Sequence, residues 1–107
     1  MTDKPKPSYA PLYCAIYEDL AASFRAKGYA LAIHGSLRRD FDLIAVPWVE
    51  KPTPPQKVVD SITEEFSLKQ IGEPTEKLHG RMAWTISLGW GHCALDLSFV
   101  GLPRLNN

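Results

Sequence analysis

Two segments of the chain carry apolar side chains at the spacing of amphipathic helices. The first stripe comprises Leu12, Ile16, Leu20 and Phe24, widened by Tyr13, Tyr17 and Ala21, and the second comprises Val58, Val59, Ile62 and Phe66. Since residues three and four apart share one face of a helix, each stripe predicts a helix with one buried face. We expect the first helix to begin near Ser8 and to end at Gly28. Thr53 and Gln56 have the spacing of a capping box, which predicts the start of the second helix.

Four further segments have the composition and alternation of strands: 29–33, 40–46, 81–88 and 93–99. The last two are joined by the glycine-rich residues 89–92, a connection typical of a hairpin. Gly72 and Pro74 indicate a surface loop over residues 71–79. Two helices of this size can cover only one face of a sheet. We therefore predict an α+β fold with two helices packed on one face of a four-stranded mixed sheet, and with the other face open.

Length and charge limit the classes of protein that need consideration. With 107 residues the chain has room for one core, and we expect a single domain over 8–100 between a disordered lead-in (1–7) and an irregular tail (101–107). Lys and Arg number 12, as do Asp and Glu, so no overall basic field points to nucleic acid. The chain lacks an apolar run long enough for a membrane span, and its start lacks a signal core, so we predict a cytoplasmic protein. Cys14 and Cys93 are expected to be buried and reduced.

Three aspartates stand out as candidates for chemistry. In an extended strand Asp40 and Asp42 project from one face, while the apolar residues between and after them enter the core. Asp96 lies on the small-residue face of a later strand, and if the two strands are neighbours the three carboxylates converge. Adjacent carboxylates repel unless a cation lies between them, and Mg²⁺ is typically held by one or two carboxylates together with substrate phosphates. Neutralisation by Arg38 and Arg39, or exposure to water, are the alternatives.

This set of residues resembles the DNA-polymerase-β-like nucleotidyltransferase superfamily. The resemblance covers residues 13–99 and rests on Gly35 and Ser36, on the Asp40-x-Asp42 pair and on the later Asp96. It implies a nucleotidyltransferase-like fold in which Gly35 and Ser36 contact nucleotide phosphates. It further implies that the three aspartates form the catalytic site and hold the metal ion.

One segment departs from the pattern of that superfamily. Only three residues, Leu37, Arg38 and Arg39, separate the Gly-Ser pair from the first aspartate, where most members have a longer loop. Residues 35–43 and 79–85 are also similar to segments of uncharacterised proteins of phages and their bacterial hosts. That similarity supplies a family without a function.

Four basic residues are further candidates for binding phosphate. Arg38 and Arg39 could clamp phosphate oxygens or could instead neutralise the neighbouring aspartates. His79 and Arg81 could bring a proton donor and a phosphate ligand to the open face, or could belong to an exposed basic loop. Among the tryptophans, which could stack on bases, we expect Trp84 in the core and Trp90 exposed in the hairpin.

Two classes of function follow from these candidates. The first is a small Mg²⁺-dependent nucleotidyltransferase-like protein that transfers a nucleotidyl or phosphoryl group, with a nucleotide or another phosphate-bearing molecule as its substrate. The second is a binding module that keeps the fold and has lost the chemistry, which the short loop favours. A metal-dependent phosphodiesterase that uses the same carboxylates is a third possibility, which only an assay distinguishes from the first.

Overall fold

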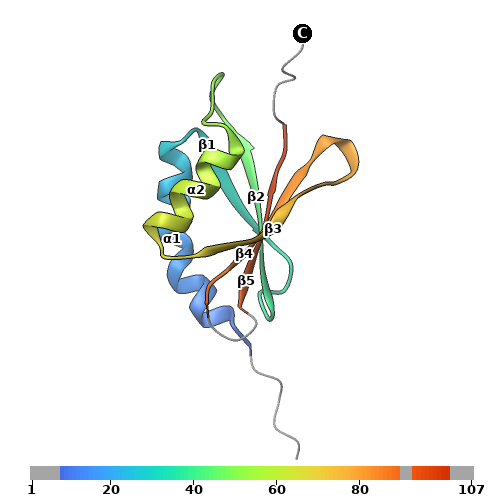
Figure 1. Cartoon of the computed structure of the whole chain (residues 1–107). Helices are drawn as coiled ribbons and strands as arrows, with labels where there is room; N and C mark the ends of the chain where they lie inside the picture. Colours follow the sequence, from blue (N-terminus) through green and yellow to red (C-terminus); the bar gives the residue numbers. More distant parts are fainter. Residues whose placement is uncertain (1–7, 90–92, 102–107) are drawn as a thin grey trace, which may run out of the picture.

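The computed structural model describes residues 8–89 and 93–101 and shows an α+β fold (Figure 1). Helices α1 (Ala10–Ala26) and α2 (Pro55–Glu65) lie together on one side of a five-stranded sheet. The strands are β1 (Tyr29–His34), β2 (Asp40–Pro47), β3 (Lys69–Glu76), β4 (Met82–Ser87) and β5 (Ala94–Phe99). A short 3₁₀ turn, Leu78–Gly80, connects β3 to β4. The opposite face of the sheet carries no helix of the described part of the chain.

The sheet is mixed, with strand order β1-β2-β5-β4-β3. The pair β2/β5 is parallel, and the pairs β1/β2, β5/β4 and β4/β3 are antiparallel. Both predicted helices and the four predicted strands are confirmed, as is the placement of both helices on one face.

The predicted number of strands was wrong, because β3 occupies most of the segment expected to be a loop. Within residues 8–89 and 93–101 it is an edge strand that pairs only with β4, and its register shifts between Ile71 and Thr75. An edge strand tolerates Pro74 because one side of its backbone forms no ladder, and the shift in register accommodates Gly72. Gly72 and Pro74 therefore indicated a loop in the sequence, although both residues are compatible with this irregular edge strand.

The core lies between the inner face of the sheet and the two helices. Its largest fully buried side chains from the sheet are Tyr29, Phe41, Leu43, Ile86, Leu95, Leu97 and Phe99. The helices contribute Tyr13, Leu20, Phe24, Val58 and Ile62, which are all members of the two predicted stripes. Trp84 is buried as expected, with its ring centroid 5.2 Å from that of Phe99. Burial of both stripes against the sheet is the main stabilising contribution to this fold.

Several smaller expectations are corrected or stay open. The cap of α2 is Pro54 without a side-chain hydrogen bond, and Gln56 instead accepts a bond from Trp84 Nε1 at 3.0 Å. Cys93 is buried, but Cys14 is exposed. Trp90 lies outside the described residues, as do the lead-in 1–7 and residues 102–107 of the tail. Neither described helix is long and apolar enough to cross a membrane.

Candidate functional site: paired carboxylates on the open sheet face

The parallel pair β2/β5 brings Asp42 and Asp96 side by side. Their Cα atoms are direct partners in the register, and Asp40 lies two positions earlier, opposite Ala94. Asp40 and Asp96 are exposed and Asp42 is half-buried, whereas Phe41 is fully buried on the other face. The three carboxylates therefore project from the helix-free face. Strand alternation predicted this orientation, but only the strand order shows that Asp42 and Asp96 are neighbours.

The surroundings of Asp42 disfavour its negative charge. Desolvation by burial raises its pKa, and the negative charges of Asp96 and Asp40 raise it further, as does hydrogen bonding with Asp96. His34, which pairs with Asp42 across β1/β2, acts in the opposite direction. A group placed in this way is stabilised by binding either a proton or a cation.

The Gly-Ser turn packs directly against Asp42. Gly35 has φ +83°, and a Cβ atom added to it would lie 2.3 Å from Asp42 Oδ2. A side chain at this position would overlap the carboxylate, and the backbone angle is one that glycine adopts at least cost. The turn thus places its backbone beside the carboxylate pair. Ser36 is exposed, and its Oγ accepts a hydrogen bond from the Arg38 N–H at 3.3 Å.

Tyr13 links helix α1 to both acidic strands. Its hydroxyl donates to the carbonyl oxygen of Arg39, and it accepts from the backbone N–H of Ala94 at 3.3 Å. Arg39 immediately precedes Asp40, and Ala94 lies two residues before Asp96. Desolvation by burial raises the pKa of Tyr13 to about 12, so the hydroxyl stays protonated and can donate. Sequence reasoning assigned this residue only to a helix stripe, because the pattern carries no signal for a hydroxyl that bridges two strands.

Arg38 and Arg39 are exposed in the turn that leads from Gly35 to β2. Among the groups that shift the pKa of Asp42, His34 lowers it, and neither arginine contributes. The backbone of both arginines is anchored, since the Arg38 carbonyl accepts from the Tyr9 N–H at 2.9 Å and the Arg39 carbonyl accepts from Tyr13. Both arginines therefore have a backbone anchored to α1 and side chains exposed to solvent.

The structure does not bring Arg81 to the acidic pair. His79 belongs to the turn Leu78–Gly80, and its side chain lies outside what the structure describes. Arg81 follows that turn, and Met82 pairs with Phe99 at the far end of β5. Arg81 is therefore four residues along the sheet from the level of Asp96, a separation of roughly 13 Å at the usual rise of a strand. The position of Arg81 therefore gives no geometric support for a patch shared with the aspartates, and the role of His79 stays a prediction.

The carboxylates present fit a metal site that is completed by water and substrate better than a site in which the protein supplies every ligand. Across residues 8–89 and 93–101, no three His, Cys, Asp or Glu side chains are grouped so that they could hold one metal ion. Asp42 and Asp96 alone form the pair, with Asp40 at the rim. Two carboxylates, with the other positions left to water and substrate oxygens, are a usual ligand set for Mg²⁺ in phosphoryl-transfer sites.

Comparison with known proteins does not assign the chain to a family. No protein-family model, no curated protein and no solved structure matches the chain. The resemblance to nucleotidyltransferases therefore rests on the residues of this chain and on where the fold places them.

Proposed function

We propose that the chain is a small nucleotidyltransferase-like protein that transfers a nucleotidyl or phosphoryl group in the presence of Mg²⁺. The observation that carries the proposal is the meeting of Asp42, Asp96 and the Gly35 turn at one point of the open sheet face. The strand arrangement supports it as well. The acidic strands β2 and β5 are parallel neighbours, with both helices behind them, an arrangement similar to a minimal nucleotidyltransferase core.

Each part of the site has a chemical role in this proposal. Asp42 and Asp96 would hold the metal ion, and Asp40 would reach it only through water. The ion would supply charge neutralisation and alignment of the phosphate oxygens. The backbone of Gly35 and Ser36 would donate to a phosphate, and the side chains of Arg38 and Arg39 would bind its outer oxygens.

Metal binding can be tested by NMR with Mn²⁺, which broadens the signals of nearby amides. We expect selective broadening at Gly35, Asp42 and Asp96, and an increase in Mn²⁺ affinity when a nucleoside triphosphate is added. Asp42→Asn should abolish the broadening. Asp19→Asn, which changes an exposed aspartate of α1, should leave it unchanged. Broadening elsewhere, or equal broadening in the Asp42→Asn protein, would contradict the proposal.

Transfer itself requires a second assay. The purified chain is incubated with Mg²⁺ and each nucleoside triphosphate, and products are separated by chromatography. We expect turnover that falls at least about a hundredfold in Asp42→Asn, the usual scale for the loss of a group that stabilises transition-state charge. A model phosphodiester, assayed in parallel, distinguishes hydrolysis of diesters from transfer.

The alternative function is a catalytically silent binding module of the same fold. The short turn favours it, because the turn holds Gly35 against Asp42 and holds Leu37 at φ +64°, a conformation unfavourable for a residue with a side chain. Binding of nucleotide and metal without any product in the transfer and diester assays would support this function and exclude the first.

A further inference from the structure

The two edges of the sheet differ in how they are protected from pairing with another strand. The β3 edge carries Lys69, Glu73 and Pro74 and has a break in register. Charges, proline and irregular register are the usual means by which proteins block an edge. The β1 edge, with the sequence YALAIH, has no proline, no Lys, Arg, Asp or Glu, and a regular register with β2. It also exposes Ile33, of which 40% is accessible to solvent.

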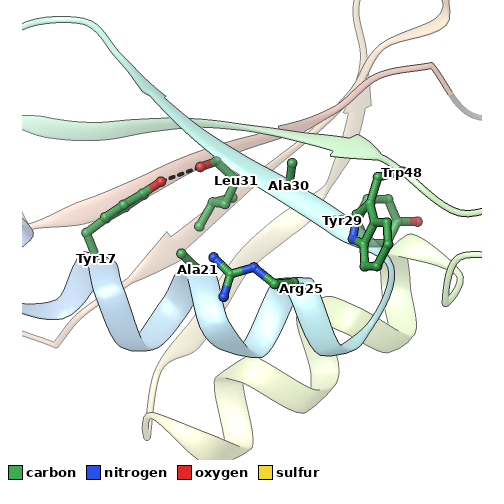
Figure 2. A pocket seen from close by; sticks show the side chains of 7 residues that line it. All are labelled: Tyr17, Ala21, Arg25, Tyr29, Ala30, Leu31 and Trp48. Atoms are coloured by element: carbon green, nitrogen blue, oxygen red, sulfur yellow. Dashed lines mark hydrogen bonds between the residues drawn. The ribbon is translucent and has the colours of Figure 1, made fainter.

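The backbone of β1 presents a regular set of outward groups. The Gly28 carbonyl accepts from the Trp48 N–H at 3.0 Å, so Gly28 faces β2. Since backbone groups alternate along a strand, those of Tyr29, Leu31 and Ile33 point away from β2. The Leu31 carbonyl accordingly accepts from the Tyr17 hydroxyl of α1 at 2.5 Å (Figure 2). A carbonyl oxygen has a second lone pair, so this bond leaves it able to accept from another chain.

A groove runs beside this edge, between α1 and β1. It has a volume of about 370 Å³ and is lined by Tyr17, Ala21, Arg25, Tyr29, Ala30, Leu31 and Trp48. Figure 2 shows Tyr17 at one end of the groove and Trp48 at the other, with Arg25 extended along α1 between them. The groove is thus an apolar hollow of side-chain size next to the outward backbone groups.

Charge is distributed unevenly along the same edge. Arg25 lies near the end of α1, and Arg25, Lys27 and Lys51 line an adjoining hollow beside Trp48. Glu18 is exposed about two turns earlier in the helix. A strand from a second copy of this chain, running antiparallel to β1, reverses this order and brings the acidic part of one helix toward the basic end of the other.

We propose that two copies of the chain pair through β1 about a twofold axis at Leu31. In this register Leu31 lies opposite Leu31 of the second copy, and Tyr29 lies opposite its Ile33. All three outward residues of each strand then exchange backbone hydrogen bonds, and the two sheets become one. The Ile33 side chain of each copy enters the groove of the other beside Tyr29, and Arg25 of each copy faces Glu18 of the other.

The oligomeric state of the purified full-length chain tests this pairing by analytical ultracentrifugation over a wide range of concentration. We expect a monomer–dimer equilibrium that Ile33→Lys shifts to monomer, because a lysine would enter an apolar groove at the interface. The matched control is Ile71→Lys on β3, an isoleucine with a similar exposed fraction, 48%, on the blocked edge. This control should dimerise as the wild type does. A wild type that is monomeric at every concentration would overturn the proposal, as would equal effects of both substitutions.

A charge exchange tests the register and does not depend on Ile33. Arg25→Glu or Glu18→Arg alone should weaken dimerisation by roughly tenfold, because each creates two like-charge contacts across the axis. The double variant should restore it. Glu18 and Arg25 are about 10 Å apart along one helix, so rescue cannot come from a pair within one chain. Circular dichroism confirms that each variant is folded, and a double variant no better than the single ones would contradict the register.

Discussion

At the scale of single residues, Asp42 is the group whose environment is most unusual. Its charge is opposed by burial and by two other carboxylates, and is supported by His34 alone among the causes of its pKa shift. Strand alternation predicted from the sequence that Asp40 and Asp42 share a face. The raised pKa of Asp42 could not be predicted, since it depends on Asp96, which is distant in sequence and adjacent only through the β2/β5 pairing.

The raised pKa of Asp42 predicts a pH-dependent effect on stability. Its pKa in the folded chain is higher than the ordinary value of 3.8, so the folded state binds the proton more tightly than the unfolded state. The corresponding stability is fully present below that ordinary value and is lost as the pH rises through the folded pKa. In the absence of divalent ions, Asp42→Asn should therefore raise the free energy of unfolding at neutral pH, and the gain should vanish in acid.

Urea unfolding of the wild type and of Asp42→Asn, each at neutral and acidic pH with a chelator present, checks this prediction. Asp19→Asn serves as the control and should leave the midpoint within error at both pH values. An Asp42→Asn protein that is less stable than the wild type at neutral pH would show that the carboxylate is stabilised in the fold, in conflict with the raised pKa.

Gly35 gives a second prediction, because the Asp42 carboxylate leaves no room for a side chain at position 35. Gly35→Ala should cost about 2 to 3 kcal/mol, because a left-handed backbone angle costs a residue with a Cβ roughly 1 to 2 kcal/mol and the new atom meets Asp42 as well. Gly80→Ala is the matched control, with φ +75° and nothing within 4 Å of the added Cβ. Gly80→Ala should lower the free energy of unfolding only by the cost of the left-handed backbone angle. Equal losses in denaturant unfolding would show that Gly35 does not pack against Asp42 as described.

At the scale of secondary-structure elements, periodic patterns in the sequence predicted the regular helices and strands, but not the irregular strand β3. The stripe of α1 and the alternation of β5 were sufficient to assign both elements. Edge strand β3 was concealed by Gly72 and Pro74, residues that are compatible with a strand only because one of its sides is unpaired. The start of α2 was assigned to a capping box, whereas Gln56 binds Trp84 and so connects the helix to the sheet. Such long-range hydrogen bonds leave no local pattern.

The Tyr13 hydroxyl is an element-scale connection that can be tested. Tyr13→Phe removes its bonds to the Arg39 carbonyl and the Ala94 N–H and should cost about 1 kcal/mol, because it leaves two partly buried backbone groups without that partner. The amide signals of Asp40, Asp42 and Asp96 should shift, since the starts of β2 and β5 lose a common anchor. Chemical denaturation and NMR of the same samples provide both readouts.

Tyr29→Phe is the matched control, since it removes a tyrosine hydroxyl that lies away from the aspartates. Tyr29 is equally buried, and its hydroxyl donates to the Thr53 carbonyl at 2.6 Å, away from the acidic pair. Its loss should lower stability by a similar amount without moving the aspartate signals. If both substitutions moved those signals alike, Tyr13 would have no special role in positioning the carboxylates.

At the scale of the whole molecule, a formally neutral chain carries a local cluster of negative charge on the face that the helices leave open. The fold class and the face on which the aspartates lie were predictable from pattern. The pairing of β2 with β5 was not, because nothing in the local sequence specifies which strands are neighbours.

A cation that binds only the folded state stabilises the whole molecule in proportion to the logarithm of its concentration. We therefore expect Mg²⁺ to raise the melting temperature of the wild type and to have little effect on Asp42→Asn. Ca²⁺ and an equal ionic strength of NaCl are the comparisons, which separate a specific site from screening of surface charge. An equal rise in both proteins would place the ion elsewhere.

Diffraction from a crystal soaked in Mn²⁺ tests most directly the proposal that Asp42 and Asp96 together bind a divalent metal ion. We expect an anomalous peak between the two carboxylates, on the side of the Gly35 turn, with Asp40 at its rim. No anomalous peak at the pair, with the two carboxyl groups in direct hydrogen-bond contact, would contradict it. That result would show that the two carboxyl groups share a proton and do not bind the ion.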